Sequence, residues 1–283
     1  MGLQIDSCVA QHIGDRSEQQ DRAAIFPHSK RRGMLVAVLA DGMGGHTGGA
    51  MAAEQVIMKA RDNFEVFAPA VESPRDLLKG VIDEAHVVIK LTRFTSEKEP
   101  HSTACVLLMQ AGRVDWAYCG DSRIYHFRGD KLVQRTTDHS FVEEMTRQGK
   151  LTPEQARRHP QKNLLLHCLG STREPRCDFG DALELTDGDS FLLCSDGLWA
   201  YFTDEELGGV LSVNTAREAA EILVQRARDR GRPTGDNLSL VILKLVDPDA
   251  RQREQMRRMN ELRNHPLAAK LGLTTDPDKR RKQ

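Results

Sequence analysis

Short apolar runs recur along the chain and are its clearest pattern. Each run is rich in Val, Ile, Leu, Phe and Tyr and is bounded by Gly, Asp or Asn, which is typical of β-strands. The predicted strands span residues 5–10, 22–26, 34–40, 102–110, 114–119, 123–127, 190–194 and 238–246. Turn-forming triplets at 111–113 and 128–130 separate strands closely enough to form hairpins, so we expect antiparallel neighbours there.

Apolar residues recur at helical spacing between these groups of strands. Residues 50–64 and 216–227 each place their apolar positions on one face of a helix, and another helix is expected over about 74–94. Capping boxes predict helix starts at three threonines: Thr152, Thr203 and Thr215. Because the helices arrive in pairs between blocks of strands, an α+β fold with antiparallel sheets and outer helices is favoured over an alternating parallel sheet.

The amino-acid composition of the chain changes after residue 247. No Pro-, Gly- or Ser-rich linker divides residues 1–247, so we interpret them as one domain. Residues 248–283 form a basic tail, predicted to be partly helical, in which residues 251–283 contain ten Lys and Arg against four Asp and Glu. A solvated tail is the simpler interpretation, and a tail that docks on a partner or touches nucleic acid is the alternative.

Charge and composition exclude several classes of protein. The 40 Lys and Arg residues balance 41 Asp and Glu residues, so binding to nucleic acid or to anionic membranes by bulk charge is disfavoured. The longest apolar run, residues 34–40, is far shorter than the roughly 20 residues that a membrane-spanning helix needs. No secretory signal is visible at the start of the chain. We therefore expect a cytoplasmic protein, and expect it to be a monomer.

Four aspartates next to glycines adjoin predicted strands. Asp41 and Asp196 directly follow apolar strands. Asp121 ends another strand, and Asp236 precedes one. Any one such pair is ordinarily only a turn, but antiparallel pairing can bring all four to one edge of the sheets. Converging carboxylates repel one another, which raises their pKa values unless cations lie among them, and all-oxygen ligands select Mg²⁺ or Mn²⁺.

The glycine-rich segment at residues 41–46 is not a nucleotide-binding loop. It lacks both the G-x-G-x-x-G spacing and the Gly-Lys-Ser/Thr of a phosphate-binding loop. Its glycines indicate a tight turn whose backbone can approach a metal ion, with the Gly42 carbonyl as an obvious oxygen ligand. The chain also lacks the G-x-S-x-G elbow of serine hydrolases, so no side-chain nucleophile is predicted.

The chain resembles the metal-dependent serine/threonine protein phosphatases of the PP2C (PPM) family, in their bacterial form. The matching segments follow one another in family order at residues 16–21, 39–46, 102–103, 120–125, 137–140, 159–170, 194–198 and 235–237. The resemblance implies an αββα four-layer sandwich, in which two central antiparallel β-sheets are flanked by helices. It also implies a variable flap at about residues 139–161.

The resemblance assigns metal-binding roles to particular residues. Asp41 would bridge two ions, either Mn²⁺ or Mg²⁺, with the Gly42 carbonyl on one of them. Asp196 and Asp236 would hold the other ion. Asp21 would act through water or from behind the direct ligands.

The remaining implied roles concern a further ion and the substrate. Asp121 matches a carboxylate that helps to bind a third, weaker ion, and Arg16 matches an arginine that grips the substrate phosphate, a task that suits a planar and permanently charged group. The implied reaction is hydrolysis of phosphoserine or phosphothreonine by a metal-activated water, opposing a bacterial serine/threonine kinase. Two positions depart from the family pattern: Gln20 replaces a common Glu, and Met43 replaces a His of eukaryotic relatives.

Two other functions remain open at this point. One is a regulatory pseudophosphatase that binds partners without turning over substrate, although the intact Asp41, Asp196 and Asp236 argue against it. The other is a nucleic-acid-associated protein that acts through its basic tail. Divalent-metal phosphoester chemistry is what the residues themselves support, while protein substrates are implied by the resemblance.

Overall fold

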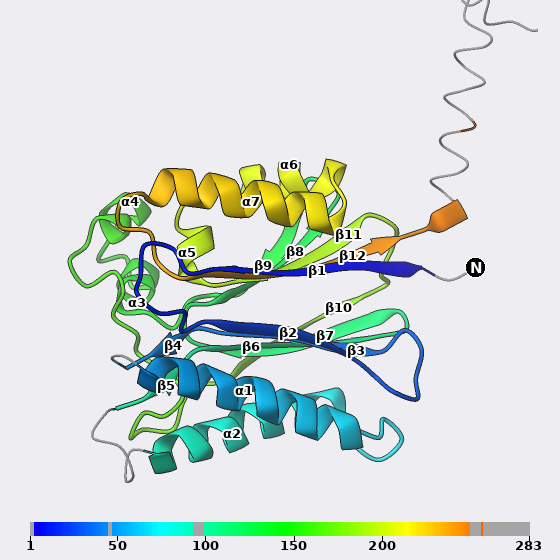
Figure 1. Cartoon of the computed structure of the whole chain (residues 1–283), viewed down its shortest axis with the longest axis horizontal. Helices are drawn as coiled ribbons and strands as arrows, with labels where there is room; N and C mark the ends of the chain where they lie inside the picture. Colours follow the sequence, from blue (N-terminus) through cyan, green and yellow to red (C-terminus); the bar gives the residue numbers. More distant parts are fainter. Residues whose placement is uncertain (1–2, 45–46, 93–98, 250–255, 257–283) are drawn as a thin grey trace, which may run out of the picture.

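A computed structural model describes residues 3–44, 47–92, 99–249 and 256, and it has four layers. Two five-stranded antiparallel sheets lie face to face, with α1 and α2 outside one and α6 and α7 outside the other (Figure 1). The first sheet has the order β1 (Gln4–His12), β12 (Leu238–Val246), β11 (Asp189–Cys194), β8 (Arg123–Arg128) and β9 (Lys131–Arg135). The second has the order β10 (Asp178–Leu183), β7 (Arg113–Cys119), β6 (Ala104–Gln110), β3 (Leu35–Ala40) and β2 (Arg22–Pro27).

The remaining elements cover the sheets or extend from one end of them. Strands β4 (Gly42–Met43) and β5 (His101–Ser102) form a small separate sheet. The helices are α1 (Thr47–Val66), α2 (Pro74–Thr92), α3 (Phe141–Arg147), α4 (Pro153–Arg157), α5 (Asp196–Trp199), α6 (Asp204–Val213) and α7 (Ala216–Gly231). The α+β sandwich predicted from the sequence is therefore confirmed.

Hydrophobic burial explains the layering. Strand β3 is buried along its whole length because both of its faces are covered. Ala37 and Leu39 belong to the core between the two sheets, whereas Val36 and Val38 belong to the core under α1 and α2. A third cluster joins the other face of the first sheet to α6 and α7. The apolar runs in the sequence are thus continuous because the central strands face two cores.

The eight predicted strands are all present, with one interruption. The run at 102–110 divides at Thr103, whose backbone N–H donates to the Asp41 carbonyl at 2.9 Å. The sequence interpretation missed β9 and β10, which are edge strands with few buried residues. It also missed the short helices α3 and α5. Each of the three predicted threonine caps forms a complete capping box, at Thr152, Thr203 and Thr215.

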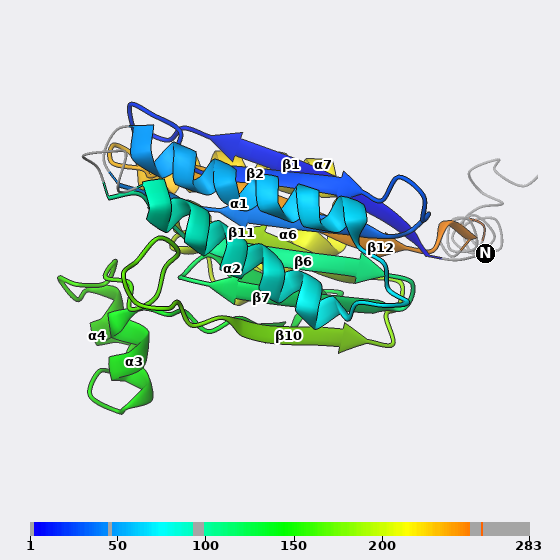
Figure 2. The same cartoon turned by 90° about the horizontal axis from the view of Figure 1, so that it is seen from below.

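The flap (residues 139–161) extends away from the sandwich. Helices α3 and α4 stand apart from both sheets, beyond the end where β4 and α5 lie (Figures 1 and 2). Backbone hydrogen bonds join Phe141 to Leu164 and Leu166 to His139, which fasten the start of the flap to the segment that follows it. No helix among the described residues is long and apolar enough to cross a membrane. The basic tail, which is predicted to be partly helical, lies outside the described residues beyond residue 249, apart from the helical Met256.

Candidate active site

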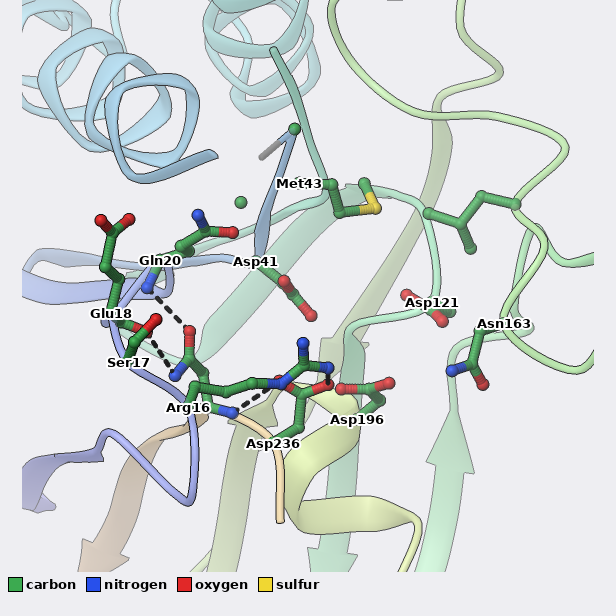
Figure 3. A pocket seen from close by; sticks show the side chains of 14 residues that line it. Arg16, Ser17, Glu18, Gln20, Asp41, Met43, Asp121, Asn163, Asp196 and Asp236 are labelled. Carbon is green, nitrogen blue, oxygen red and sulfur yellow. Dashed lines mark hydrogen bonds and ion pairs between the residues drawn. The ribbon is translucent and has the colours of Figure 1, made fainter. Parts of the chain in front are cut away.

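A pocket of about 490 Å³ opens at this end of the sandwich. Its lining includes six of the seven residues singled out from the sequence, namely Arg16, Asp41, Gly42, Asp121, Asp196 and Asp236. The aspartate side chains surround the space from different elements, and Arg16 enters from the opposite side to Asp121 (Figure 3). The seventh residue, Asp21, lies buried behind the pocket.

Strand pairing explains why residues so far apart in the chain meet here. Strand β11 lies between β8 and β12, and its last residue, Cys194, pairs with Arg123 on one side and Leu240 on the other. The residues just beyond these pairs, Asp121, Asp196 and Asp236, therefore reach the same edge of the first sheet. Asp41 arrives from the second sheet, where it follows β3.

A chain of hydroxyl groups joins the turns of the two sheets. The Asp41 backbone N–H donates to Thr103 Oγ1 at 2.9 Å, and this oxygen lies 2.7 Å from Ser122 Oγ. The neighbouring Gly120 has a φ of 107°, and a Cβ there would lie 2.6 Å from the Thr103 side chain. The Asp41 and Asp121 turns are thus held together by a contact that only glycine permits.

Gly42 is required for a similar reason. A Cβ at this position would lie 2.0 Å from the Gly49 carbonyl oxygen in the first turns of α1. The backbone between β3 and α1 can therefore turn tightly, which leaves Gly42 among the residues that line the pocket.

Asp21 is a buried carboxylate with only half of its hydrogen-bonding capacity used. It is 1% exposed, and Ser195 Oγ donates to its Oδ2 at 2.7 Å. Its other oxygen, Oδ1, has no hydrogen-bond partner among the described residues. Burial raises the pKa of Asp21 to about 6. A buried acceptor without a donor is costly unless a cation or water completes it, so this residue fits a site that holds metal ions.

The pocket carboxylates are electrostatically unsatisfied as a group. Burial raises the pKa of Asp196 to about 7, with the charges of Asp236 and Asp21 adding to the effect. Burial also raises the pKa values of Asp41 and Asp121 well above their usual range. Within the described residues, no group of three or more His, Cys, Asp or Glu side chains is arranged so that it could hold a metal ion by itself. The arrangement is an acidic cavity that cations would neutralise.

Arg16 is the only basic residue that lines the pocket within the described part of the chain. Its Nη2 lies 2.7 Å from Asp236 Oδ2, and the two side chains are 60% and 36% exposed (Figure 3). Asn237 holds the loop that carries Arg16, because its Oδ1 accepts from the Gln20 N–H and its Nδ2 donates to the Ile13 and Glu18 carbonyls. Arg16 therefore extends from an anchored loop with its end exposed at the pocket.

Sequence reasoning assigned no role to several residues of the site. Asn163 and Leu165 line the pocket from the segment that follows the flap, while Thr103 and Ser195 support the carboxylates. All four fall in segments that carry the family resemblance, which was the available signal. Gln20 and Met43, which depart from the family pattern, also line the pocket.

The fold and the site together define a phosphatase of the metal-dependent class, and the comparisons agree. The family model described as Protein phosphatase 2C matches residues 9–235. The protein phosphatase PhpP of Streptococcus pneumoniae is 31% identical over 238 residues, covering 83% of this chain and 95% of PhpP. PstP of Mycobacterium tuberculosis, a serine/threonine protein phosphatase, is 32% identical over 219 residues, covering 77% of this chain and 41% of PstP.

Solved structures show the same likeness. The serine/threonine phosphatase of Streptococcus agalactiae superposes with a TM-score of 0.78 at 28% identity, covering 86% of this chain and all of that one. The PstP catalytic domain in complex with two manganese ions superposes with a TM-score of 0.72 at 28% identity, covering 87% of this chain and all of that one. The chain belongs to the PP2C family and is a bacterial-type, metal-dependent serine/threonine protein phosphatase.

Proposed function

We propose that the carboxylates of the pocket hold two divalent cations, Mn²⁺ or Mg²⁺, in the roles expected from the family. Asp41 would be shared between the ions, with the Gly42 carbonyl on one and Asp196 and Asp236 on the other. The observation that carries this proposal is the excess of carboxylates over basic groups at the pocket, together with the buried, unpartnered Oδ1 of Asp21. Asp21 would act through water or from behind the direct ligands, and Asp121 would help to bind a third ion more weakly.

The chain's own groups would bind and orient the phosphorylated substrate. Arg16 offers a planar, permanently charged donor at the pocket, which suits a phosphate dianion. When bound, the divalent cations would acidify water so that it can attack phosphorus, and would offset the charge on the phosphoryl group. Met43 has no proton to donate to the leaving group, so the side chain at this position cannot act as the general acid.

The proposed substrates are phosphoserine and phosphothreonine proteins, including those modified by a serine/threonine kinase that this enzyme opposes. PhpP and PstP, which are named as protein phosphatases, support this assignment.

The direct test measures hydrolysis of p-nitrophenyl phosphate and of a phosphothreonine peptide, with Mn²⁺, with Mg²⁺ and with EDTA. We expect turnover with at least one metal and none with EDTA. Asp62→Asn, an exposed change on α1, is the matched control for substitutions in the pocket, because Asp62 pairs only with its neighbour Arg61 among the described residues. Folded protein that is inactive under every condition would instead favour the pseudophosphatase.

A further inference from the structure

The turn that carries Asp121 is held by a group outside the carboxylate cluster. The indole Nε1–H of Trp199 donates to the main-chain carbonyl of Asp121 at 2.9 Å. Trp199 is the last residue of α5, the short helix that begins at Asp196. One side chain therefore connects the helix that carries one pocket aspartate to the turn that carries another.

The indole is itself held on its face by a paired cation. The guanidinium carbon of Arg123 lies 3.5 Å from the centre of the Trp199 ring. Arg123 also donates two hydrogen bonds to Asp138, each of 2.8 Å, and the two side chains are only 14% and 8% exposed. A planar guanidinium that is locked by a bidentate carboxylate provides a fixed surface on which the ring can stack.

The same turn is gripped from the side of the flap. His139, which follows Asp138, donates its backbone N–H to the Gly120 carbonyl at 2.9 Å. Its Nδ1 accepts from the Gly120 N–H at 3.2 Å. The peptide before Asp121 is thus held by the base of the flap, while the carbonyl after it is held by Trp199.

We propose that Trp199 is a positioning residue for Asp121. The carbonyl that accepts the indole hydrogen bond belongs to Asp121 itself, so this bond fixes the peptide plane from which the carboxylate projects. Arg123 and Asp138 hold the indole in the required orientation. The inference rests on the proposed function, in which Asp121 helps to bind the weakest of the cations.

The decisive variant is Trp199→Phe, which keeps an aromatic ring for Arg123 to stack on but removes the indole N–H. Titration with Mn²⁺, followed by calorimetry and by the electron paramagnetic resonance of free Mn²⁺, should show the weakest ion bound about three- to ten-fold less tightly, as expected from loss of one hydrogen bond. The tighter ions should change by less than about twofold, since Trp199 donates to the Asp121 turn.

The chain supplies a matched control and a second reporter. Its only other tryptophan, Trp116, lies in the core against Gly180, so Trp116→Phe should leave Mn²⁺ affinity unchanged. In that variant Trp199 is the sole tryptophan, and quenching of its emission by Mn²⁺ should include a weak phase. Adding Asp121→Ala should remove this phase.

The outcomes separate this inference from the proposed function. Wild-type Mn²⁺ affinities in Trp199→Phe would overturn the role of Trp199 and leave the proposed function intact. A uniform weakening of all ions, or a large fall in thermal stability in EDTA, would mean a general structural role and would also overturn it. If the phenylalanine variant does not fold, Arg123→Lys, which keeps the charge but loses the planar stack, should weaken the same ion selectively. Wild-type protein that binds neither Mn²⁺ nor Mg²⁺ would refute both proposals.

Discussion

Strand β11 has an aspartate near each of its ends, and the fold treats the two in opposite ways. At the end distant from the pocket, Asp189 is fully buried but receives hydrogen bonds from Arg128 Nε at 2.8 Å and from the Thr186 N–H at 2.8 Å. His126 Nε2 lies 3.2 Å from the same carboxylate. Although burial alone raises the pKa of Asp189, the Arg128 and Thr186 hydrogen bonds lower it below its usual value.

At the pocket end, Asp196 follows the same strand without such compensation. No Lys, Arg or His within the described residues forms an ion pair with it, and burial together with the charges of Asp236 and Asp21 raises its pKa to about 7. The contrast teaches that this fold can neutralise a buried carboxylate with its own arginine and hydrogen bonds. At the pocket, several carboxylates together lack a neutralising positive charge from the protein. Such a group of side chains is typical of a site that binds metal cations.

The largest expected effect is a difference in enzymatic activity between a variant at the pocket and a variant at the distant end of β11. Asp41→Asn keeps the shape of the side chain but removes its charge, so Mn²⁺-dependent hydrolysis of p-nitrophenyl phosphate should fall more than about 100-fold. Asp189→Asn, measured under conditions where it is folded, should stay within a few-fold of the wild type. Near-normal turnover by Asp41→Asn would reject its bridging role.

The next effect concerns the single basic residue at the pocket. Arg16→Ala should raise KM for a phosphopeptide about 10- to 100-fold with little change in kcat, because the arginine binds phosphate in both the ground state and the transition state. Arg61→Ala, which removes an exposed arginine of α1, is the control. A large fall in kcat at constant KM would instead assign Arg16 to the transition state.

The third prediction concerns stability in the absence of metal, where the substitution of Asp189 should have a larger effect than the substitution of Asp196. Asp189→Asn should lower the free energy of unfolding by about 2 kcal/mol, a value reduced because Arg128 is half exposed. Asp196→Asn should not lower it in EDTA, because the substitution removes a buried charge that lacks a partner. Urea unfolding of both variants measures the difference, and equal losses would contradict the contrast between the two ends.

The last prediction is a pH dependence confined to the metal-free protein. The folded-state pKa values of Asp21, about 6, and of Asp196, about 7, lie above the unfolded value near 4, so the folded chain binds more protons than the unfolded chain between these limits. Stability in EDTA should therefore fall as the pH rises from about 5 to 8.

Thermal unfolding across this pH range checks the expectation. The midpoint in EDTA should drop towards pH 8, because the folded chain loses its additional bound protons over this range. Saturating Mn²⁺ should raise the midpoint most at pH 8 and flatten the dependence. A metal-free midpoint that increases with pH would contradict the assigned direction.

Much of the architecture could be predicted because it is encoded locally. Apolar runs that end in Gly and Asp predicted the six interior strands of the two sheets and the edge strands β1 and β2. Each threonine cap lies within three residues of its partner. Strands β9 and β10 escaped prediction because each has only two or three apolar residues among charged residues or glycine, so neither forms a continuous apolar run. The positions of the aspartates next to strand ends were likewise visible in the sequence.

The sequence by itself determined which residues could carry metal chemistry, because side-chain type and strand ends are local properties. Only the tertiary structure decided which of them lack a cation. Asp189 and Asp196 adjoin the same strand, yet Arg128 reaches one from β8 and no basic side chain of the described residues pairs with the other. Likewise, Trp199 meets Asp121 across 78 residues. Compensation of a buried charge depends on distance and burial in space, which pairing between distant segments sets.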